Sequence, residues 1–350
     1  MIRIGIYSLQ AQKRDNRRRR KKRMERNVWT DGIFGVVVGD ALGCPVEFAD
    51  REERKVDPVL GMREYGTFNL PMGSWTDDSS LTLAALAGIA EKKKVDLDDI
   101  MNRFVDWLQN GAYTPFDYAF DVGHGTMQAV MRYARNHDVK ACGGTTGRDN
   151  GNGSLMRIMP FCLYCYEQEQ NGKMDRREAI GLIHDASALT HNHIRSLIAC
   201  GLYYFMIVSI LEHRMDSEKD LEKRLPEILQ EGITKGRTFY ESIGVPAHEL
   251  QHYERLWELD SFGKLEDSVI RSTGYVVDTI EAAVWSLITT TDYRDCELKA
   301  VNLGMDTDTV AAIAGGFAGL YYGVDGIPEE WMQVIQRREW IHELCMSAAN

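Results

Sequence analysis

The sequence predicts an all-α protein, built as a single-domain orthogonal bundle of many helices. Segments with a helical spacing of apolar residues recur along the chain, and small polar residues that cap helices precede several of them. Alternating Val/Ile-rich segments, which are typical of strands, are scarce. The chain has 350 residues, of which 44% are hydrophobic, and this is enough for one large core.

The expected helices follow from local patterns. Apolar side chains recur with a period near 3.6 in residues 97–110, and residues 76–94 run from small polar residues to a lysine-rich end, which suits the helix dipole. Asp31 is the expected N-cap of a helix that ends near Gly43. Residues 197–211 are the longest apolar run; they are too short for a membrane span of about 20 residues and predict a buried central helix. Further helices are expected in residues 216–235, in residues 279–290 and after Thr309, with residues 214–272 at the periphery.

Charge is divided unevenly along the chain. Residues 1–23 carry ten Lys/Arg and one Asp, a balance of +9, so the formal net charge of −11 becomes −20 for residues 24–350. We interpret residues 1–23 as a basic, disordered extension that precedes the domain of residues 24–350. Runs of Arg and Lys are what a purine-rich ribosome-binding site encodes when it is translated, so we hypothesise a translated leader with Met24 as the true start. The acidic domain repels polyanions, and we expect no general nucleic-acid binding.

The cysteines bear on the compartment. They are seven in number and widely scattered, and no apolar segment of the secretory type follows the basic N-terminus. We therefore expect a reduced, cytoplasmic protein, monomeric and without membrane association. Cys162 and Cys165 form a lone C-x-x-C and are interpreted as core residues.

Three acidic clusters lie near predicted helix starts. They are Thr76, Asp77 and Asp78; Asp306, Thr307, Asp308 and Thr309; and Asp40 with Glu47. Helix capping is the simpler interpretation, but one residue suffices for it, whereas several carboxylates near buried surface need a counter-charge. Oxygen ligands without nearby His or thiolate favour Mg²⁺, or alternatively Mn²⁺, over Zn²⁺. Clusters that face each other would form a site for two ions that activates a water.

Glycines mark two further features. The glycines of residues 315–319 leave one helix face bare, so the backbone can approach another helix closely. Gly147, Gly151 and Gly153 lie in a loop whose N–H groups can bind phosphate, with a flexible surface turn as the alternative interpretation.

In order and wording, these motifs resemble the ADP-ribosylglycohydrolase family. The match runs from about residue 30 to 326 through GVVVGDALGCPVE, GSWTDDSSL, FDVGHGT, GNGSLMR, SALTH, GYVVDTIEAAVWSL and AVNLGMDTDTVAAIAGGFAGLYYG. The pairing of T-D-D with D-T-D-T is its most specific part. The resemblance implies the all-α fold of that family, two Mg²⁺ ions and hydrolysis of the glycosidic bond between ADP-ribose and an acceptor. The acceptor would be an ADP-ribosylated protein side chain or a small ADP-ribose conjugate.

The resemblance also implies roles for single residues. The metal ligands would be Thr76, Asp77, Asp78, Asp306, Asp308 and Thr309. The substrate cleft would be lined by Asp121, Gly123, His124, Gly151, Asn152, Gly153, Ser154 and His191, the last with a satisfied core histidine as the alternative. The catalytic residues would be Glu47, Asp77, Asp121 and Asp308, and the general base stays open among Asp121, Glu47 and a metal ligand such as Asp77. His124 stands where arginine-specific members often have Asn, so arginine, serine, an O-acetyl ester and a nucleic-acid end all stay open as acceptors.

Two other functions fit the same residues. A module that binds ADP-ribose without turnover would keep the cleft, although the complete set of ligands argues against it. A two-metal pyrophosphohydrolase would release AMP instead of ADP-ribose, so the identity of the product separates the two reactions.

Overall fold

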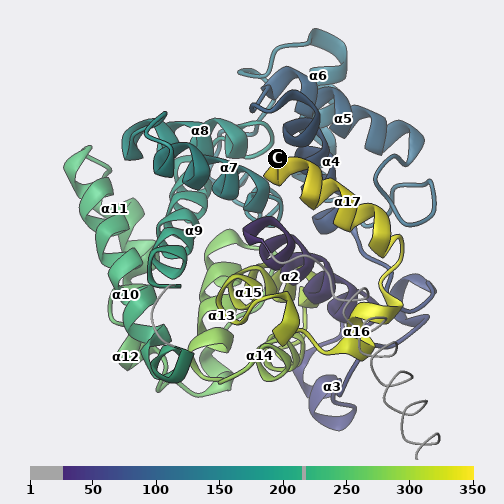
Figure 1. The fold of residues 1–350 in the computed structure, drawn as a ribbon, viewed down its shortest axis with the longest axis vertical. Helices are drawn as coiled ribbons and strands as arrows, with labels where there is room; N and C mark the ends of the chain where they lie inside the picture. The colour runs from purple at the N-terminus through teal and green to yellow at the C-terminus, as the bar shows by residue number, and fades with distance from the viewer. Residues whose placement is uncertain (1–26, 215–217) are drawn as a thin grey trace, which may run out of the picture.

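The computed structural model describes residues 27–214 and 218–350, and this part of the chain contains helices and no strand (Figure 1). The prediction of an all-α fold is confirmed. The α-helices are α2 (Val28–Gly43), α3 (Arg51–Val56), α4 (Asp77–Lys92), α5 (Leu97–Asn110), α6 (His124–Asn136), α7 (Met159–Gln170), α8 (Arg176–Ala188), α9 (Ile194–His213), α10 (Glu218–Ser242), α11 (Ala247–Leu250), α12 (Leu259–Phe262), α13 (Val276–Ile288), α14 (Tyr293–Val301), α15 (Thr307–Tyr322), α16 (Glu329–Val334) and α17 (Arg338–Ala349). Short 3-10 helices are η1 (Cys44–Val46), η2 (Gly66–Phe68), η3 (Gln251–Trp257), η4 (Asp267–Val269) and η5 (Val324–Gly326). The predicted extension of residues 1–23 lies outside the described residues.

Helices α2 and α15 lie side by side at the centre of the molecule (Figure 1). A Cβ on Gly35 would lie 2.1 Å from the carbonyl oxygen of Gly315, and one on Gly43 would lie 2.4 Å from the backbone nitrogen of Asp308. Residue numbers rise along one helix as they fall along the other, so the two helices are antiparallel. The end of α2 therefore meets the start of α15, and this brings two of the predicted acidic clusters together.

The bare glycine face of α15 is confirmed, with one difference. A Cβ on Gly319 would lie 2.2 Å from the carbonyl oxygen of Asp31, so this glycine also faces α2. Gly316 points elsewhere, because its Cβ would lie 2.4 Å from the hydroxyl oxygen of Tyr203 on α9. Close backbone approach thus occurs on both sides of α15.

The predicted central helix is α9. It packs against α8, α10, α13 and α15, and residues Leu202 to Leu211 are all buried. Among the described residues it is the one helix long and apolar enough to cross a membrane by length and composition, but 83% of its apolar window is buried inside the protein. Its hydrophobicity is that of a core helix. Cys162 and Cys165 are core residues too, and all seven cysteines are buried and free.

The predicted N-cap of α2 is wrong. Asn27 caps this helix, and its side chain accepts a hydrogen bond from the backbone nitrogen of Thr30 at 2.9 Å, as part of a capping box. Asp31 lies in the first turn instead, where its carboxylate accepts a hydrogen bond from the backbone of Val324 at 2.7 Å and pairs with Arg214. Asp31 therefore makes a long-range contact, although its residue type suggested an N-cap.

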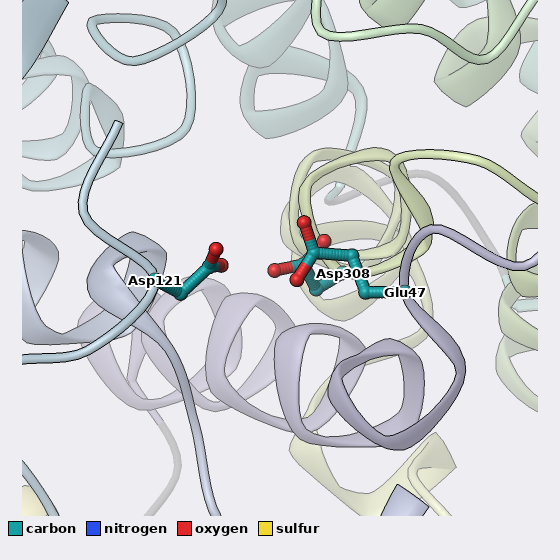
Figure 2. A group of neighbouring side chains, drawn as sticks. All are labelled: Glu47, Asp121 and Asp308. Carbon is teal, nitrogen blue, oxygen red and sulfur yellow. The ribbon is translucent and has the colours of Figure 1, made fainter. Parts of the chain in front are cut away.

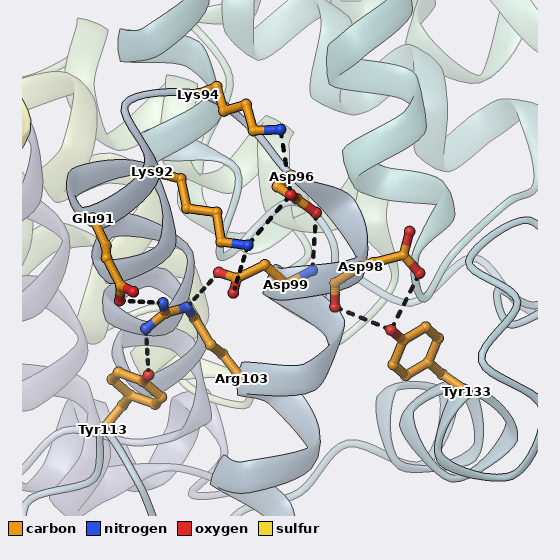
Figure 3. Close-up of polar contacts among 9 residues, drawn as sticks. All are labelled: Glu91, Lys92, Lys94, Asp96, Asp98, Asp99, Arg103, Tyr113 and Tyr133. Carbon is orange, nitrogen blue, oxygen red and sulfur yellow. Dashed lines mark hydrogen bonds and ion pairs between the residues drawn. The ribbon is translucent and has the colours of Figure 1, made fainter.

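A polar network joins α4, α5 and the loop before α6 (Figure 3). Arg103 on α5 donates hydrogen bonds to Asp99 at 2.7 Å, to Glu91 at 2.6 Å and to the hydroxyl of Tyr113 at 2.9 Å. Tyr113 lies in the loop that leads to Asp121, so the network fixes that loop against the helix that begins with Asp77. Helices α10, α11 and α12 lie at one edge of the molecule, as expected for residues 214–272 (Figure 1).

Candidate metal centre and substrate cleft

The first acidic cluster stands at the start of α4, where Thr76 is the N-cap and accepts a hydrogen bond from the backbone of Asp78 at 3.4 Å. The Asp40 carboxylate reaches the same helix start from α2. It accepts hydrogen bonds from the backbone nitrogens of Thr76 and Ser79, both at 2.9 Å, and from the hydroxyl of Ser79. Burial raises the pKa of Asp40 to about 6, while these hydrogen bonds act in the opposite direction. Asp40 is thus a cap supplied by a neighbouring helix, and it lies near the end of α2, not at a helix start as predicted.

The capping of α4 leaves the carboxylates of Asp77 and Asp78 available for other contacts. Asp77 accepts one long hydrogen bond, 3.4 Å, from the backbone of Gly123. The hydroxyl of Thr309 lies 3.3 Å from one oxygen of Asp78, so the starts of α4 and α15 face each other. The second oxygen of Asp78 is buried without a hydrogen-bond partner among the described residues.

Asp306 connects the start of α15 to the glycine-rich loop. One of its carboxylate oxygens accepts a hydrogen bond from the side-chain amide of Asn152 at 2.7 Å. The backbone of Asn152 in turn donates to the carbonyl oxygen of Gly274 at 3.0 Å, and its side-chain amide donates to the hydroxyl of Thr279 at 3.0 Å. Asn152, which the sequence predicted to line the cleft, therefore orients a predicted metal ligand.

Glu47, Asp121 and Asp308 point into one common space (Figure 2). One carboxylate oxygen of each lies within 4.8 Å of the others, and Glu47 and Asp308 are buried whereas Asp121 is partly exposed. The close contact of Gly43 with Asp308 places Glu47, which follows η1, beside the start of α15. Asp121 enters from the opposite side, on the loop before α6, and has a positive φ of 52°. Three segments far apart in sequence thus form one acidic centre.

The ionised forms of the buried carboxylates in this centre need a positive charge nearby. Burial, together with the carboxylates of Asp121 and Asp306, raises the pKa of Glu47 to about 11. Burial and the neighbouring carboxylates, Glu47 first, also hold the pKa of Asp308 well above its usual range. One oxygen of Glu47 and one of Asp308 are buried without a hydrogen-bond partner among the described residues. Free, buried carboxylate oxygens of this kind fit a hard divalent cation.

A cleft of about 360 Å³ opens over the acidic centre. It is lined by Glu47, Phe48, Asp77, Asp78, Asp121, Val122, Gly123, His124, Gly125, Thr126, Gly151, Asn152, Gly153, Met156, His191, Gly274, Asp306 and Thr309. None of these lining residues is a lysine or an arginine. Several of them, such as Phe48, Gly125 and Gly274, were not predicted, although each directly adjoins or lies within a motif that the sequence singled out.

The predicted residues missing from the lining are buried beneath it. Thr76 and Asp308 are almost fully buried at the starts of α4 and α15. The hydroxyl of Ser154 accepts a hydrogen bond from Ser187 at 2.9 Å and lies 3.6 Å from the sulfur of Cys200, so its side chain stands behind the cleft wall.

His191 lies in the cleft wall and is also held from behind. Its Nδ1 lies 2.9 Å from the hydroxyl of Thr190, which accepts a hydrogen bond from Arg157 at 2.7 Å. The other ring nitrogen faces the glycines of the cleft: a Cβ on Gly125 would lie 3.0 Å from Nε2. Burial, and secondarily the charge of Arg157, lowers the pKa of His191 to about 3. His191 is thus a neutral imidazole. Its Nδ1 has a hydrogen-bond partner in Thr190, and its Nε2 faces the cleft.

The remaining predicted histidine differs. His124 is exposed at the start of α6, with its Nε2 2.9 Å from the amide nitrogen of Gln128. Sequence reasoning missed Arg157 and Thr190. The available signal was an arginine inside the otherwise apolar run that follows the glycine-rich loop, because a buried cation needs a specific partner.

This chain is similar to known proteins in both sequence and structure. A family model described as ADP-ribosylglycohydrolase matches residues 22–350. The ADP-ribosylarginine hydrolase Tri1 of Pseudomonas putida is 28% identical over 313 residues, which cover 89% of this chain and 75% of that protein. The ADP-ribosyl-[dinitrogen reductase] glycohydrolase of Rhodospirillum rubrum is 27% identical over 308 residues, 87% of this chain and 89% of that protein. A solved structure titled ADP-ribosylglycohydrolase-related protein complex superposes with a TM-score of 0.71 at 27% identity, covering 92% of this chain and 96% of that chain.

Proposed function

The chain belongs to the ADP-ribosylglycohydrolase family, and from this premise we propose that it uses two Mg²⁺ ions to hydrolyse the glycosidic bond between ADP-ribose and its acceptor, a protein side chain or a small conjugate. The observation that supports the metal is the buried acidic centre, with its free carboxylate oxygens and a lining without lysine or arginine. Mn²⁺ is the alternative ion, because it prefers the same oxygen ligands. The seven buried, free thiols suit a reducing compartment such as the cytoplasm.

The proposed ligands are the side chains of Thr76, Asp77, Asp78, Asp306, Asp308 and Thr309. When bound, the ions would neutralise these carboxylates and supply Lewis-acid chemistry for the attacking water and the ribose hydroxyls. Asp308 has a distinct position in this set, because it alone also belongs to the group of three with Glu47 and Asp121. Of the proposed ligands, Asp308 would therefore be the one whose loss affects the bound metal most.

Other residues would hold the substrate and move its protons. Glu47 and Asp121 reach the space next to Asp308 from opposite sides, so either carboxylate can hold the proton of the attacking water (Figure 2). Cleavage at the anomeric carbon develops positive charge on the sugar, as in other glycoside hydrolyses, and an acidic surrounding stabilises it. The loop of Gly151 and Gly153 would bind the pyrophosphate through backbone N–H groups.

The test is a turnover assay on an ADP-ribosylated protein, with and without Mg²⁺ after exhaustive chelation, in which all nucleotide products are identified. We expect Mg²⁺-dependent release of free ADP-ribose, and loss of this release in Asp308→Asn. Release of AMP would show a pyrophosphohydrolase instead. Binding of ADP-ribose with no product from any conjugate, N-linked or O-linked, would show a binding module.

A further inference from the structure

A chain of aromatic side chains extends outward from Phe48 in the cleft lining, and no step proposed above uses it. We call it the aromatic rim; its rings, in spatial order, are Phe48, Phe68, Phe120, Tyr118 and Phe116. The centroids of neighbouring rings lie 6.3, 5.3, 6.0 and 6.2 Å apart. Phe48 directly follows Glu47 and Phe120 directly precedes Asp121, so the rim joins the two loops that supply those carboxylates.

The rim is exposed to an unusual degree for a continuous aromatic cluster. Phe48 is 64% exposed and Tyr118 is 48% exposed, and the other three rings are only partly buried. Phe48 also lines the cleft, so the exposed rings are continuous with the candidate catalytic site. Contiguous apolar surface beside a functional cleft is typical of a binding surface, and aromatic rings supply most of the contact energy in such surfaces.

The backbone that carries these rings is firmly held. Phe68 lies in the turn of η2, where a Cβ on Gly66 would lie 1.9 Å from the carbonyl oxygen of Pro45 and where Thr67 donates a hydrogen bond to the backbone of Glu47 at 2.8 Å. On the other side, Arg337 donates to the carbonyl oxygen of Thr114 at 2.9 Å, beneath the loop of Phe116 and Tyr118. A rigid surface loses little conformational freedom when it binds a partner.

Charge indicates the chemistry of that partner. The three segments that form the rim and its surroundings, residues 40–50, 64–78 and 112–131, contain no lysine or arginine. Of their acidic residues, Asp50, Glu64 and Asp117 are exposed and Asp121 is partly exposed. Asp117 lies between Phe116 and Tyr118 in the sequence. The neighbouring Arg63 pairs with Asp57 at 2.6 Å.

We propose that the aromatic rim docks a basic segment of the acceptor protein, in which arginine side chains that flank the ADP-ribosylated residue stack on the exposed rings. This proposal rests on the proposed function, since it names the partner of the same site. Guanidinium groups bind aromatic faces and carboxylates at the same time, and the rim offers exposed rings next to an acidic cleft. A nucleic-acid end would bring phosphates to a cleft whose lining is acidic and contains no lysine or arginine.

The experiment compares four substrates: a peptide with one ADP-ribosylated arginine flanked by arginines, the same peptide with glutamine in the flanks, free ADP-ribosylarginine, and an ADP-ribosylated oligonucleotide. The enzyme variants are Phe116→Ala/Tyr118→Ala, Tyr118→Phe and Asp117→Asn, with the exposed Val269→Ala as the matched control outside the rim. We measure kcat and KM at low and high salt. Fluorescence anisotropy of the unmodified basic peptide reports docking without turnover.

We expect wild type to prefer the basic peptide over the neutral one about tenfold in kcat/KM, through KM, with a preference that falls as salt rises. The double alanine variant should lose this preference while its turnover of free ADP-ribosylarginine stays unchanged, and Tyr118→Phe should retain it because the ring remains. The proposal would be overturned if wild type turned over both peptides equally, or if the double variant lost kcat/KM equally on all substrates. Faster turnover of an ADP-ribosylated oligonucleotide than of the basic peptide would also overturn it. If neither these substrates nor an O-linked conjugate is hydrolysed, the proposed function fails, and the anisotropy titration still decides docking.

Discussion

The hydroxyl of Thr190 lies 2.9 Å from Nδ1 of His191 and accepts, at 2.7 Å, a hydrogen bond from Arg157. Among the described contacts, Nδ1 is the one acceptor available to the hydrogen of that hydroxyl, since the guanidinium only donates. The network therefore assigns the proton of the neutral imidazole to Nε2, which faces the cleft. His191 is a fixed hydrogen-bond donor toward a substrate oxygen, not a group that exchanges protons near neutral pH.

The first prediction follows from this relay. Thr190→Val should lower kcat/KM roughly tenfold, because the imidazole then loses the hydrogen bond that selects its tautomer. Thr190→Ser keeps the hydroxyl and should retain activity. Nitrogen NMR of the imidazole gives a readout independent of folding: the Nε2–H form should dominate in wild type and in Thr190→Ser. Full activity and the same tautomer in Thr190→Val would show that the relay does not orient the ring.

The second prediction concerns Asp308. Asp308→Asn should lower kcat at saturating Mg²⁺ by at least about 100-fold, because the proposed ligand next to Glu47 and Asp121 loses its charge. Thr76→Ala should cost less, since Asp40 still accepts hydrogen bonds from the start of α4. Metal-free Asp308→Asn should melt at a higher temperature than metal-free wild type, because a neutral amide replaces a carboxyl whose ionised form is disfavoured first by burial and then by Glu47. Near-normal turnover in Asp308→Asn would show that Asp308 is not an essential metal ligand.

The third prediction concerns acid stability and His184 on α8. Its Nε2 lies 2.9 Å from the hydroxyl of Tyr240, and burial lowers its pKa to about 4. Because the unfolded chain binds this proton near pH 6.5, the unfolded state holds more protons between pH 6.5 and 4, and stability falls as pH falls through that window. His184→Gln should reduce the loss of stability between pH 7 and pH 5 by at most about 2 kcal/mol. Urea unfolding at both pH values measures this, with the exposed His248→Gln as control; an unchanged loss would contradict it.

The sequence predicted much of the fold because most helices here are locally encoded. Residues 97–110 carry a clear apolar period and coincide with α5, and the small polar residues at 76–80 begin α4 where expected. Asp31 shows the limit of this reasoning. Its type and position suit a cap, but whether it caps depends on the backbone of Val324, almost the length of the chain away. Local pattern cannot contain that information.

The candidate site was predictable to a similar degree. The T-D-D and D-T-D-T motifs identified two acidic clusters, and in the structure the starts of α4 and α15 face each other, with Thr309 3.3 Å from Asp78. The spacing of acidic residues along the sequence could not distinguish Asp40, a helix cap, from the candidate metal ligands. Its role as a cap for α4 depends on which N–H groups it contacts in the folded protein. The same holds for the aromatic rim: Phe116, Tyr118 and Phe120 alternate within one segment, but Phe48 and Phe68 join them only in space.

The last prediction tests how the fold builds the site. The end of α2 touches the start of α15 at Gly43, where a Cβ would lie 2.4 Å from the backbone nitrogen of Asp308 and 2.5 Å from its Cα. Because both neighbours are backbone atoms, Gly43→Ala must separate the two helices, and it should destabilise the protein by about 3 kcal/mol or more. The same shift moves Glu47 away from Asp308, so turnover should fall further than the loss of folded protein explains. Gly181→Ala is the matched control: it lies in α8 with nothing within 4 Å of its added Cβ, and it should be neutral or stabilise by about 0.5–1 kcal/mol. Urea unfolding and kcat per folded molecule measure both effects. If Gly43→Ala unfolds like wild type and keeps full turnover, the contact between α2 and α15 does not position the acidic centre.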